Sequence, residues 1–554
     1  MPTRNEKRSA SRARPAILAA LCLLCAGGCG DSRNAAGIAV TETRTYGKGQ
    51  LRVIGGIPFL KLSGSSAEMG EQYGVLLKKE IAEAYKAVPG LDNRADREGN
   101  IPRLEKCLPP EYARFLKGIA RGSGKDYYQV LKAAYTAYET FPGLFCSSVL
   151  IKVNGPGGKS QLLHAKNLDN GSPTGEGQAV VEFNPEGAYS YLVTEVIGFG
   201  ACDGMNEEGI SLSIDSGGQG ARSAFPDNAV LTAKMHEIFA SARNAAEAKA
   251  RLKDYACDAE MILILGSGSE NDGIVFDISY EKIRETRLGG QPNLFVTNTF
   301  LSPDFTPPDR LRECPRYAII DGYMKRGAVN NLDDLIAMMS DPGTTYGVNN
   351  YQTKHAAVYD PRNKTAYLAF ADSYAAWGRW LAYDWRSDTV RPYRDRSGET
   401  GPVSLRRTAA REVASIRATV MRDEDQDALW DELNAFLKRN GIGSTAPAYT
   451  LSHRTEGAFD LEVVQPVDRE APGAPRVRFS TARSMKLACV TQKGPYKTLA
   501  CGYYALNRWL ADNGYTASGP MRRTWLKGSW NESDQREWLT EISVPVERKP
   551  GKRR

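Results

Sequence analysis

A cysteine, a lysine and a carboxylate lie where one hairpin of strands can bring them together. Residues 146–153 read Cys-Ser-Ser-Val-Leu-Ile-Lys-Val and residues 161–169 read Gln-Leu-Leu-His-Ala-Lys-Asn-Leu-Asp, with a glycine-rich segment between them. Two apolar runs around a turn predict a strand and a returning strand. The hairpin returns Lys166 and Asp169 to the side of Cys146, so that a nucleophile, a cation and a carboxylate converge. Charged residues at strand ends are more often simply solvated, and spacing alone favours that alternative.

The rest of the sequence gives little support for metal or cofactor chemistry. Its four histidines are scattered. No HExxH, GxSxG or glycine-rich phosphate loop is present, and no CxxC occurs after the apolar amino-terminal run, in which Cys22 and Cys25 are apolar filler. Most of the formal net charge of +7 belongs to the two ends of the chain, which leaves a body near neutrality. A nucleic-acid groove would need a concentrated basic stripe. We therefore expect no metal, no cofactor and no nucleic-acid partner.

Four separated motifs carry a resemblance to a known family over about residues 51–385. They are Glu68-Met69-Gly70 with Gly74, Cys146-Ser147-Ser148 with Lys166-Asn167-Leu168-Asp169, Gly204-Met205-Asn206-Glu207-Glu208-Gly209, and Val296-Thr297-Asn298 followed by Arg310 and Arg312. In kind and order they resemble the linear-amide hydrolases with an N-terminal cysteine, which include bile salt hydrolases, acid ceramidases and autoproteolytic isopenicillin N acyltransferase-like enzymes. The resemblance implies an α+β fold, the four-layered αββα sandwich of the N-terminal-nucleophile hydrolases.

The resemblance also implies a mechanism centred on Cys146. Self-cleavage of the Phe145-Cys146 bond would separate a pro-segment, residues 51–145, from a chain that begins with the nucleophile. The new α-amine, with an ordinary pKa of about 7.7 to 8, then accepts the thiol proton, so that no histidine is needed. Asp169 would hold this amine, and Asn206 and Asn298 would stabilise the oxyanion and bind the scissile amide.

Two positions depart from the family pattern. Many relatives have arginine where this chain has Lys166, and lysine keeps the charge but loses the planar fork of donors. A lysine still lowers the pKa of a neighbouring thiol. Phe145 stands where small residues are common, so we expect slower self-cleavage. Arg310 and Arg312 are the substrate-binding residues that the resemblance implies.

The amino terminus has the pattern of an export signal. Basic residues precede an apolar run that is too short to span a membrane. We expect residues 1–28 to be a lipoprotein signal peptide that ends in a lipobox-like Ala-Gly-Gly before Cys29, which would be acylated. An ordinary secretory signal cleaved nearby is the alternative. Residues 29–50 are expected to be a polar tether. Because Gly30 rather than aspartate follows the cysteine, we expect a membrane-anchored protein of the cell envelope, in the outer membrane.

The remaining sequence is typical of a linker and a second domain. Residues 386–445, charged and at first rich in Gly, Ser and Pro, are expected to be a linker and a helix. Residues 446–548 resemble the gyrase-inhibitor-like effector-binding domains, smaller α+β units in which an aromatic cleft with a carboxylate binds amphipathic cations. Residues 549–554 form a basic tail. The matching ligand-binding positions are Tyr496, Trp538 and Glu541. The alternative is that the aromatic residues belong to the core and that Glu541 is a strand-edge charge.

Three functions remain open for the whole chain. The first is hydrolysis of a small-molecule amide, N-acyl or peptide-like, outside the cytoplasm. The second is acyl transfer from a thioester to an amine on the same scaffold, although coenzyme A thioesters are not expected there. The third is a ligand-binding lipoprotein whose hydrolase fold is inert. A processed Cys146 that reacts with a thiol-directed probe would favour the two enzymatic functions.

Overall fold

The computed structural model describes most of the chain after the amino-terminal segment. The described residues are 38, 40–86, 91, 97–136, 145–169, 177–221, 230–253, 255, 259–279, 282–343, 347–350, 352–371, 374–395, 400–420, 425–453, 459–472, 475–494, 496 and 499–548. The expected signal peptide, the lipidation site at Cys29 and the basic tail lie outside them. Within these ranges, no helix is long and apolar enough to cross a membrane.

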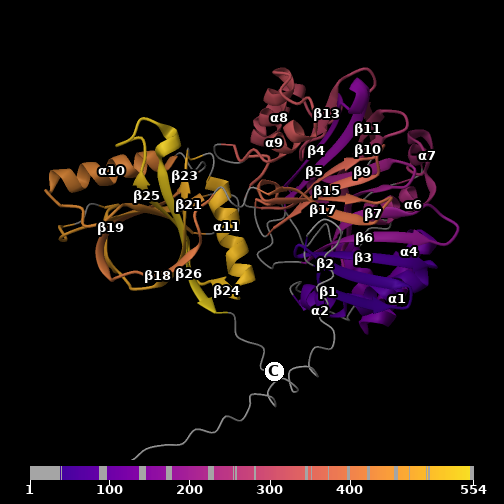
Figure 1. The fold of residues 1–554 in the computed structure, drawn as a ribbon, viewed down its shortest axis with the longest axis horizontal. Helices are drawn as coiled ribbons and strands as arrows, with labels where there is room; N and C mark the ends of the chain where they lie inside the picture. Colours follow the sequence, from indigo (N-terminus) through magenta and orange to yellow (C-terminus); the bar gives the residue numbers. More distant parts are fainter. Residues whose placement is uncertain are drawn as a thin grey trace, which may run out of the picture.

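Two large sheets, of ten and seven strands among the described residues, make up the first body (Figure 1). In sheet order the ten strands are β1 (Val40–Tyr46), β2 (Gly49–Ile54), β3 (Ile57–Gly64), β6 (Gln178–Pro185), β7 (Tyr191–Val196), β8 (Gly200–Asn206), β9 (Ile210–Ala221), β10 (Ala259–Ser267), β11 (Asp272–Ile278) and β12 (Ile283–Arg287). The seven are β13 (Asn293–Val296), β4 (Phe145–Asn154), β5 (Ser160–Asp169), β14 (Thr353–Asp360), β15 (Thr365–Phe370), β16 (Arg379–Asp384) and β17 (Thr389–Asp395).

Helices cover the outer faces of both sheets. Against the ten-stranded sheet lie α1 (Ser66–Leu76), α2 (Lys78–Lys86), α3 (Arg97–Cys107), α4 (Pro110–Ser123), α5 (Tyr127–Thr136), α6 (Leu231–Ser241) and α7 (Ala245–Ala250), and against the seven-stranded sheet lie α8 (Pro315–Lys325) and α9 (Leu332–Met339). Phe115 of α4 and Phe183 of β6 belong to the first helix-to-sheet core. Leu192 of β7 and Leu381 of β16 belong to a second core that contains residues of both sheets. The predicted αββα sandwich is confirmed.

The Glu68-Met69-Gly70 motif has a structural explanation. Ser65 caps the N-terminus of α1, and Glu68 completes the capping box by accepting the Ser65 N–H at 2.8 Å. Gly70 lies so close to α4 that a β-carbon there would stand 2.0 Å from the carbonyl oxygen of Phe115. Glycine therefore lets the two helices pack backbone against backbone, and these motif residues build the fold rather than the reaction site.

The strands before α1 extend the ten-stranded sheet. β1 begins at Val40 and pairs with β2, so residues 40–50 are not the tether that their polar composition suggested. Most residues of this edge strand are exposed, which explains the polar sequence. β3 then pairs with β6 along its length, in parallel. The segment before Cys146 is thereby built into the same sheet as the segment after it.

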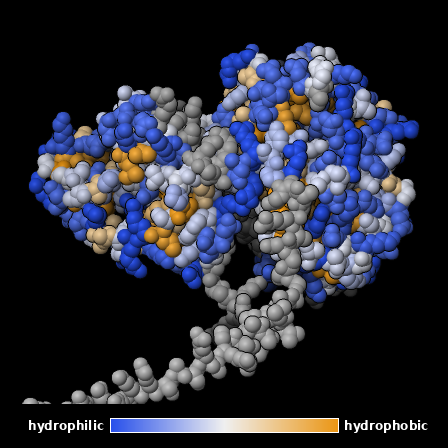
Figure 2. Space-filling model, viewed as in Figure 1, coloured by the Kyte–Doolittle hydropathy of each residue, from blue (hydrophilic) through white to orange (hydrophobic). Residues whose placement is uncertain are grey.

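A third sheet with two helices forms the second body. In sheet order its strands are β18 (Ser404–Arg407), β23 (Lys486–Lys493), β26 (Leu539–Arg548), β25 (Met521–Lys527), β20 (Tyr449–His453), β21 (Phe459–Pro466), β19 (Arg411–Val420) and β22 (Arg478–Ala482), with β24 (Tyr515–Ala517) paired to β26. The helices α10 (Gln426–Arg439) and α11 (Leu499–Asp512) pack on it. In Figure 2 the visible surface of both bodies is mainly hydrophilic, with small apolar patches.

The boundary between the two bodies differs from the predicted one. The helix expected within residues 386–445 is present as α10. The remainder is not a linker, because β17 belongs to the seven-stranded sheet while β18 and β19, like α10, belong to the second body. All four residues of β18 are exposed, and charged edge strands of this kind have the composition of a linker.

Candidate active site

The predicted hairpin is present. β4 and β5 pair so that Phe145 is opposite Asp169, Cys146 is opposite Leu168, and further along Ser147 is opposite Asn167. The peptide bond at which we expect cleavage therefore lies across the hairpin from the carboxylate that is expected to hold the new amine.

Cys146 is almost completely buried. Only 1% of Cys146 is exposed to solvent, and its backbone N–H donates a 2.7 Å hydrogen bond to Oδ1 of Asn298. Burial raises the pKa of the thiol to about 11, while the positive charge of Lys166 acts in the opposite direction. The thiol of the uncut chain is therefore protonated at neutral pH, and a base has to take its proton before the sulfur can attack.

Asp169 is held by three side chains. Oγ1 of Thr353 and Nδ2 of Asn350 donate hydrogen bonds of 2.6 and 2.8 Å to its carboxylate, and the guanidinium of Arg316 stands 3.8 Å away. Burial raises the pKa of Asp169 to about 6, although each of these partners lowers it. The sequence analysis missed Asn350 and Thr353, since they come far along the chain and no local pattern marks them.

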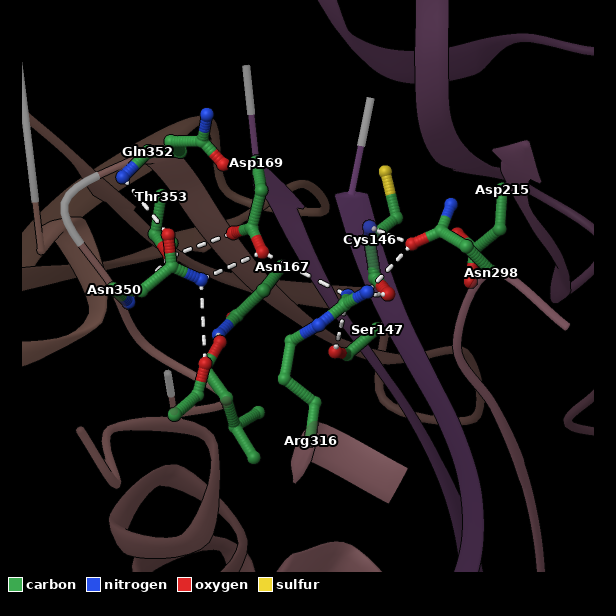
Figure 3. A network of polar contacts seen from close by, with 12 residues as sticks. Cys146, Ser147, Asn167, Asp169, Asp215, Asn298, Arg316, Asn350, Gln352 and Thr353 are labelled. Carbon is green, nitrogen blue, oxygen red and sulfur yellow. Dashed lines mark hydrogen bonds and ion pairs between the residues drawn. The ribbon is translucent and has the colours of Figure 1, made fainter. Parts of the chain in front are cut away.

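Arg316 connects the nucleophile with the carboxylate (Figure 3). Its guanidinium donates to the carbonyl oxygen of Cys146, to Oδ1 of Asn298 at 2.8 Å and to Oγ of Ser147 at 3.3 Å, and it forms the ion pair with Asp169. It is 2% exposed. The sequence analysis missed it, although one signal was available. Arg316 lies in the first turn of α8, where a positive side chain opposes the helix dipole and therefore needs another reason to be there.

Arg310 and Arg312, the expected substrate-binding residues, are not part of this buried cluster. The short 3-10 helix η2 (Pro308–Glu313) buries Leu311 and exposes both arginines. Arg312 forms its ion pair with Asp321, at 3.0 Å. The role of both arginines in substrate binding stays a prediction, and the arginine that contacts Cys146 is Arg316.

Lys166 is fully buried and has a carboxylate partner. Its Nζ forms an ion pair with Asp215 and donates to the carbonyl oxygen of Ile214 at 2.6 Å. Ser148 donates to the same carboxylate at 3.0 Å. Burial alone would lower the pKa of Lys166, but the charge and hydrogen bond of Asp215 together with the negative charges of other neighbours outweigh burial and raise this pKa. The lysine therefore stays charged and acts on Cys146 through space, while Asp215, which the sequence analysis missed, balances it.

Asn206 has a structural role in place of the predicted catalytic one. Its Nδ2 donates to the carbonyl oxygens of Phe239 at 2.9 Å and Ala242 at 2.7 Å, and its Oδ1 accepts the N–H of Ile210 at 2.9 Å. These bonds join the C-terminal end of α6 to the turn between β8 and β9. Both amide hydrogens are used, so this side chain has none to donate to an oxyanion, and the prediction is wrong.

Asn298 lies at the nucleophile, as expected. The N–H of Cys146 and the guanidinium of Arg316 both donate to its Oδ1, which fixes the orientation of the amide. Its Nδ2 donates to the carbonyl oxygen of Ser216 at 3.0 Å. In the uncut chain Asn298 therefore positions the nitrogen of Cys146, and its part in oxyanion stabilisation stays a prediction.

The three residues predicted to bind a ligand lie on two different faces of the sheet in the second body. Tyr496 contacts Trp538 and Trp525, with ring centroids 4.5 and 5.0 Å apart, and packs on the core beneath α11. Successive residues of a strand point to opposite faces of the sheet. Trp525 pairs with Thr540 on this covered face, so the next residue, Glu541, points to the other face. There Glu541 forms an ion pair with Arg406.

Comparison with known proteins identifies the second body. Residues 401–547 match the family described as the GyrI-like small molecule binding domain. The second body is therefore a GyrI-like domain, and it includes β18, β19 and α10, which the sequence analysis had assigned to a linker and a helix.

Solved structures with local likeness fall into two groups. EcmrR in its complex with DNA is 29% identical over 26% of this chain and 57% of that chain, with a TM-score of 0.25, so the match spans little more than half of EcmrR. The Caenorhabditis elegans ortholog of N-acylethanolamine-hydrolyzing acid amidase is 16% identical over 39% of this chain and 93% of its own, with a TM-score of 0.31. Penicillin V acylase from Agrobacterium tumefaciens is 12% identical over 43% of this chain and 91% of its own, with a TM-score of 0.30. No curated protein sequence matches the chain.

Proposed function

We propose that the first body hydrolyses linear amides and that its nucleophile is Cys146, placed at a new chain end by cleavage of the Phe145-Cys146 bond. One observation carries the proposal. The nitrogen of Cys146 already has an acceptor, Oδ1 of Asn298 at 2.7 Å, and the buried carboxylate of Asp169 lies across the hairpin. An α-amine formed at this position would find the partners that a catalytic base needs.

The first reaction would be the cleavage of the chain itself. Sγ of Cys146 attacks the carbonyl carbon of Phe145, the thiol proton passes to the amide nitrogen, and the C–N bond breaks. The product is a thioester between Phe145 and Cys146 with a free α-amine. Water then adds to the thioester, which gives a carboxylate at Phe145 and returns the thiol.

Turnover would follow the same course with an external amide. The α-amine of Cys146 takes the thiol proton, and the sulfur forms a bond to the carbonyl carbon of the substrate. The resulting ammonium gives its proton to the leaving amine, and water hydrolyses the acyl thioester to the acid. Arg316 keeps a positive charge beside the Cys146 carbonyl and Asp169, and so holds both in place while the amine changes its charge.

The second body would serve as a receptor for a small molecule. Its membership of the GyrI-like domains supports this role. In this chain the buried Glu541 is already neutralised by Arg406, whose side chain is 49% exposed. A cationic ligand would therefore have to displace the arginine from the carboxylate, which makes Arg406 a competitor for the site.

Export and lipid anchoring at Cys29 complete the proposal. They are supported by the apolar run and the lipobox-like residues before that cysteine. Fractionation of cells that produce the parent and Cys29→Ala tests this point. The parent should sediment with the outer membrane, and equal recovery of both proteins in the soluble periplasmic fraction would contradict it.

The enzymatic proposal is tested by the terminus of the large chain and by a thiol-directed covalent probe. Active protein should contain a chain that begins at Cys146, and the probe should label that residue. Cys146→Ala should stay uncut, unlabelled and inactive towards a panel of N-acyl amides. Cys489→Ala is the matched control, because Cys489 is also buried and burial raises its pKa to about 11 as well. Active protein that is only uncut, or that begins elsewhere, would refute the mechanism.

A further inference from the structure

The two bodies meet where one short segment of the first contacts one helix of the second. The 3-10 helix η3 (Ala375–Trp377) follows Tyr374, whose ring stacks on that of Tyr503 in α11, with centroids 5.6 Å apart and planes 12° from parallel. The indole N–H of Trp377 donates to the sulfur of Cys501 in the same helix. Trp377 and Cys501 are 5% and 1% exposed, so this contact is a small buried core.

The fit of α11 against this segment is close. The hydroxyl of Tyr504 accepts the N–H of Arg379 at 3.2 Å, and Tyr504 is 2% exposed. A β-carbon at Gly378 would stand 2.0 Å from the ring of Tyr504, so only glycine fits there. Tyr374 has a φ of +50°, a left-handed conformation that a non-glycine residue keeps when its surroundings impose it. The stacked ring of Tyr503 is part of those surroundings.

The same segment is bonded to the residue that holds Asp169. The N–H of Tyr374 donates to the carbonyl oxygen of Asn350 at 3.1 Å, and Nδ2 of Asn350 donates to Asp169 at 2.8 Å. Asn350 is 3% exposed and also bonds to the carbonyl oxygen of Gly347. Two hydrogen bonds and one ring stack therefore lead from the carboxylate of the active site to the GyrI-like domain.

We propose that Tyr503 is a positioning residue for the reaction at Cys146, and that α11 of the GyrI-like domain thereby completes the amide hydrolase site. Tyr503 holds Tyr374 in its left-handed conformation, Tyr374 fixes the backbone of Asn350, and Asn350 sets the carboxylate of Asp169 against the new amine. This inference rests on the proposed hydrolase function. A carboxylate that loses one of its donors is free to turn, and a displacement of that size lowers the rate of a positioned reaction.

Tyr503→Ala in the full chain tests this assignment. We expect about a tenfold fall in kcat with little change in KM, since Tyr503 acts on Asp169 through Tyr374 and Asn350. Tyr503→Phe keeps the stacked ring and should restore kcat. Trp509→Ala is the matched control, because Trp509 also stacks on a tyrosine, Tyr515, with centroids 5.4 Å apart, but does so within the GyrI-like domain. It should leave kcat unchanged.

A second measurement is independent of activity. In the uncut background of Cys146→Ala, hydrogen exchange at the amides of Tyr374 and Gly378 should become faster with Tyr503→Ala and not with Trp509→Ala. Unchanged exchange would overturn the positioning role whether or not the protein hydrolyses amides. If the parent is cut, labelled at Cys146 and active, while Tyr503→Ala keeps full kcat, only the positioning proposal fails. If the parent is uncut and inactive, the hydrolase proposal fails instead.

Discussion

Phe145 and Asp169 are cross-strand partners at the open end of the β4–β5 hairpin. Because Cys146 follows Phe145, a cut between them would turn a residue inside a strand into a chain end without moving it away from the carboxylate. The nucleophile and its base would then occupy a site that had folded before either was functional.

Arg316 should be the arginine on which activity depends. Its removal takes away a buried positive charge that contacts Cys146, Asn298 and Asp169, so Arg316→Ala should lower kcat/KM by about 10²- to 10³-fold. Arg310→Ala and Arg312→Ala, at exposed positions of η2, should stay near the parent value. Steady-state kinetics of the three variants on one N-acyl amide shows which arginine the activity requires. Comparable losses in all three variants would contradict the position of Arg316.

Asp169 should add a lower step to the acid limb of the pH profile. The first step belongs to the α-amine of Cys146, which must be neutral to take the thiol proton and has an ordinary pKa of about 7.7 to 8. Only the ionised form of Asp169 can hold the amine, and in the uncut chain burial raises its pKa to about 6. A positive amine nearby lowers this pKa, so at or below about pH 6 the fall of kcat/KM with decreasing pH should become steeper. Asp169→Asn should lose about 10²-fold in rate or more and should also lose the lower step. The same steepening in Asp169→Asn would assign the lower step to another group.

The same carboxylate makes the uncut protein less stable as pH rises. The pKa of Asp169 is raised from 3.8 to about 6, so between these values the folded chain keeps a proton that the unfolded chain has released. This contribution to the free energy of unfolding is complete below the lower value and lost as pH passes the upper one. Denaturant titrations at several pH values give the free energy of unfolding of Cys146→Ala with and without Asp169→Asn. Between pH 3.8 and about 6 this free energy should fall more steeply with pH in the protein that keeps Asp169.

Asn206 and Asn298 should separate stability from catalysis. Asn206→Ala leaves the buried carbonyl oxygens of Phe239 and Ala242 without their donors, which should cost about 1–3 kcal/mol for each unsatisfied group. The Tm should fall while kcat of the folded enzyme is kept. Asn298→Ala should lower kcat with a smaller change in Tm. Thermal unfolding and initial rates, measured on the same preparations, would show a reversed pattern if Asn206 were the catalytic amide.

Arg406 should weaken the binding of cations to the GyrI-like domain. Arg406→Ala removes the guanidinium that neutralises the buried Glu541, so the affinity for tetraphenylphosphonium should rise by about tenfold, the size of one charge-assisted interaction. Glu541→Gln should abolish the gain when both changes are combined. Calorimetry on the full chain measures both effects. Equal affinities in the parent, Arg406→Ala and the double variant would place the ligand elsewhere.

The sequence was sufficient for the local parts of this site. Two apolar runs around a glycine-rich turn predicted the hairpin that returns Asp169 to the side of Cys146. This signal arises within a few residues of the chain, where strand periodicity and turn residues act. The four-layered arrangement came from the family resemblance, since periodicity alone does not say how sheets stack.

What the sequence did not reveal depends on contacts between distant segments. Arg316, Asn350 and Asp215 reach the site from other elements. Apart from the place of Arg316 in the first turn of a helix, nothing beside them in the chain marks a catalytic neighbour. Asn206 was misassigned because a sequence motif gives the type and position of a residue but does not say which groups its side-chain amide contacts. The charged strand β18 was misread as a linker because an exposed edge strand has the same composition.

The parallel pairing of β3 with β6 has a consequence for reversibility. In the uncut protein both strands belong to one polypeptide, and refolding after heat is a unimolecular event. Once the Phe145-Cys146 bond is broken, the same pairing joins two molecules, and recovery requires a bimolecular encounter whose rate depends on concentration. The mature protein would then be a metastable heterodimer, protected by the slowness of strand release rather than by an equilibrium that it could re-establish alone.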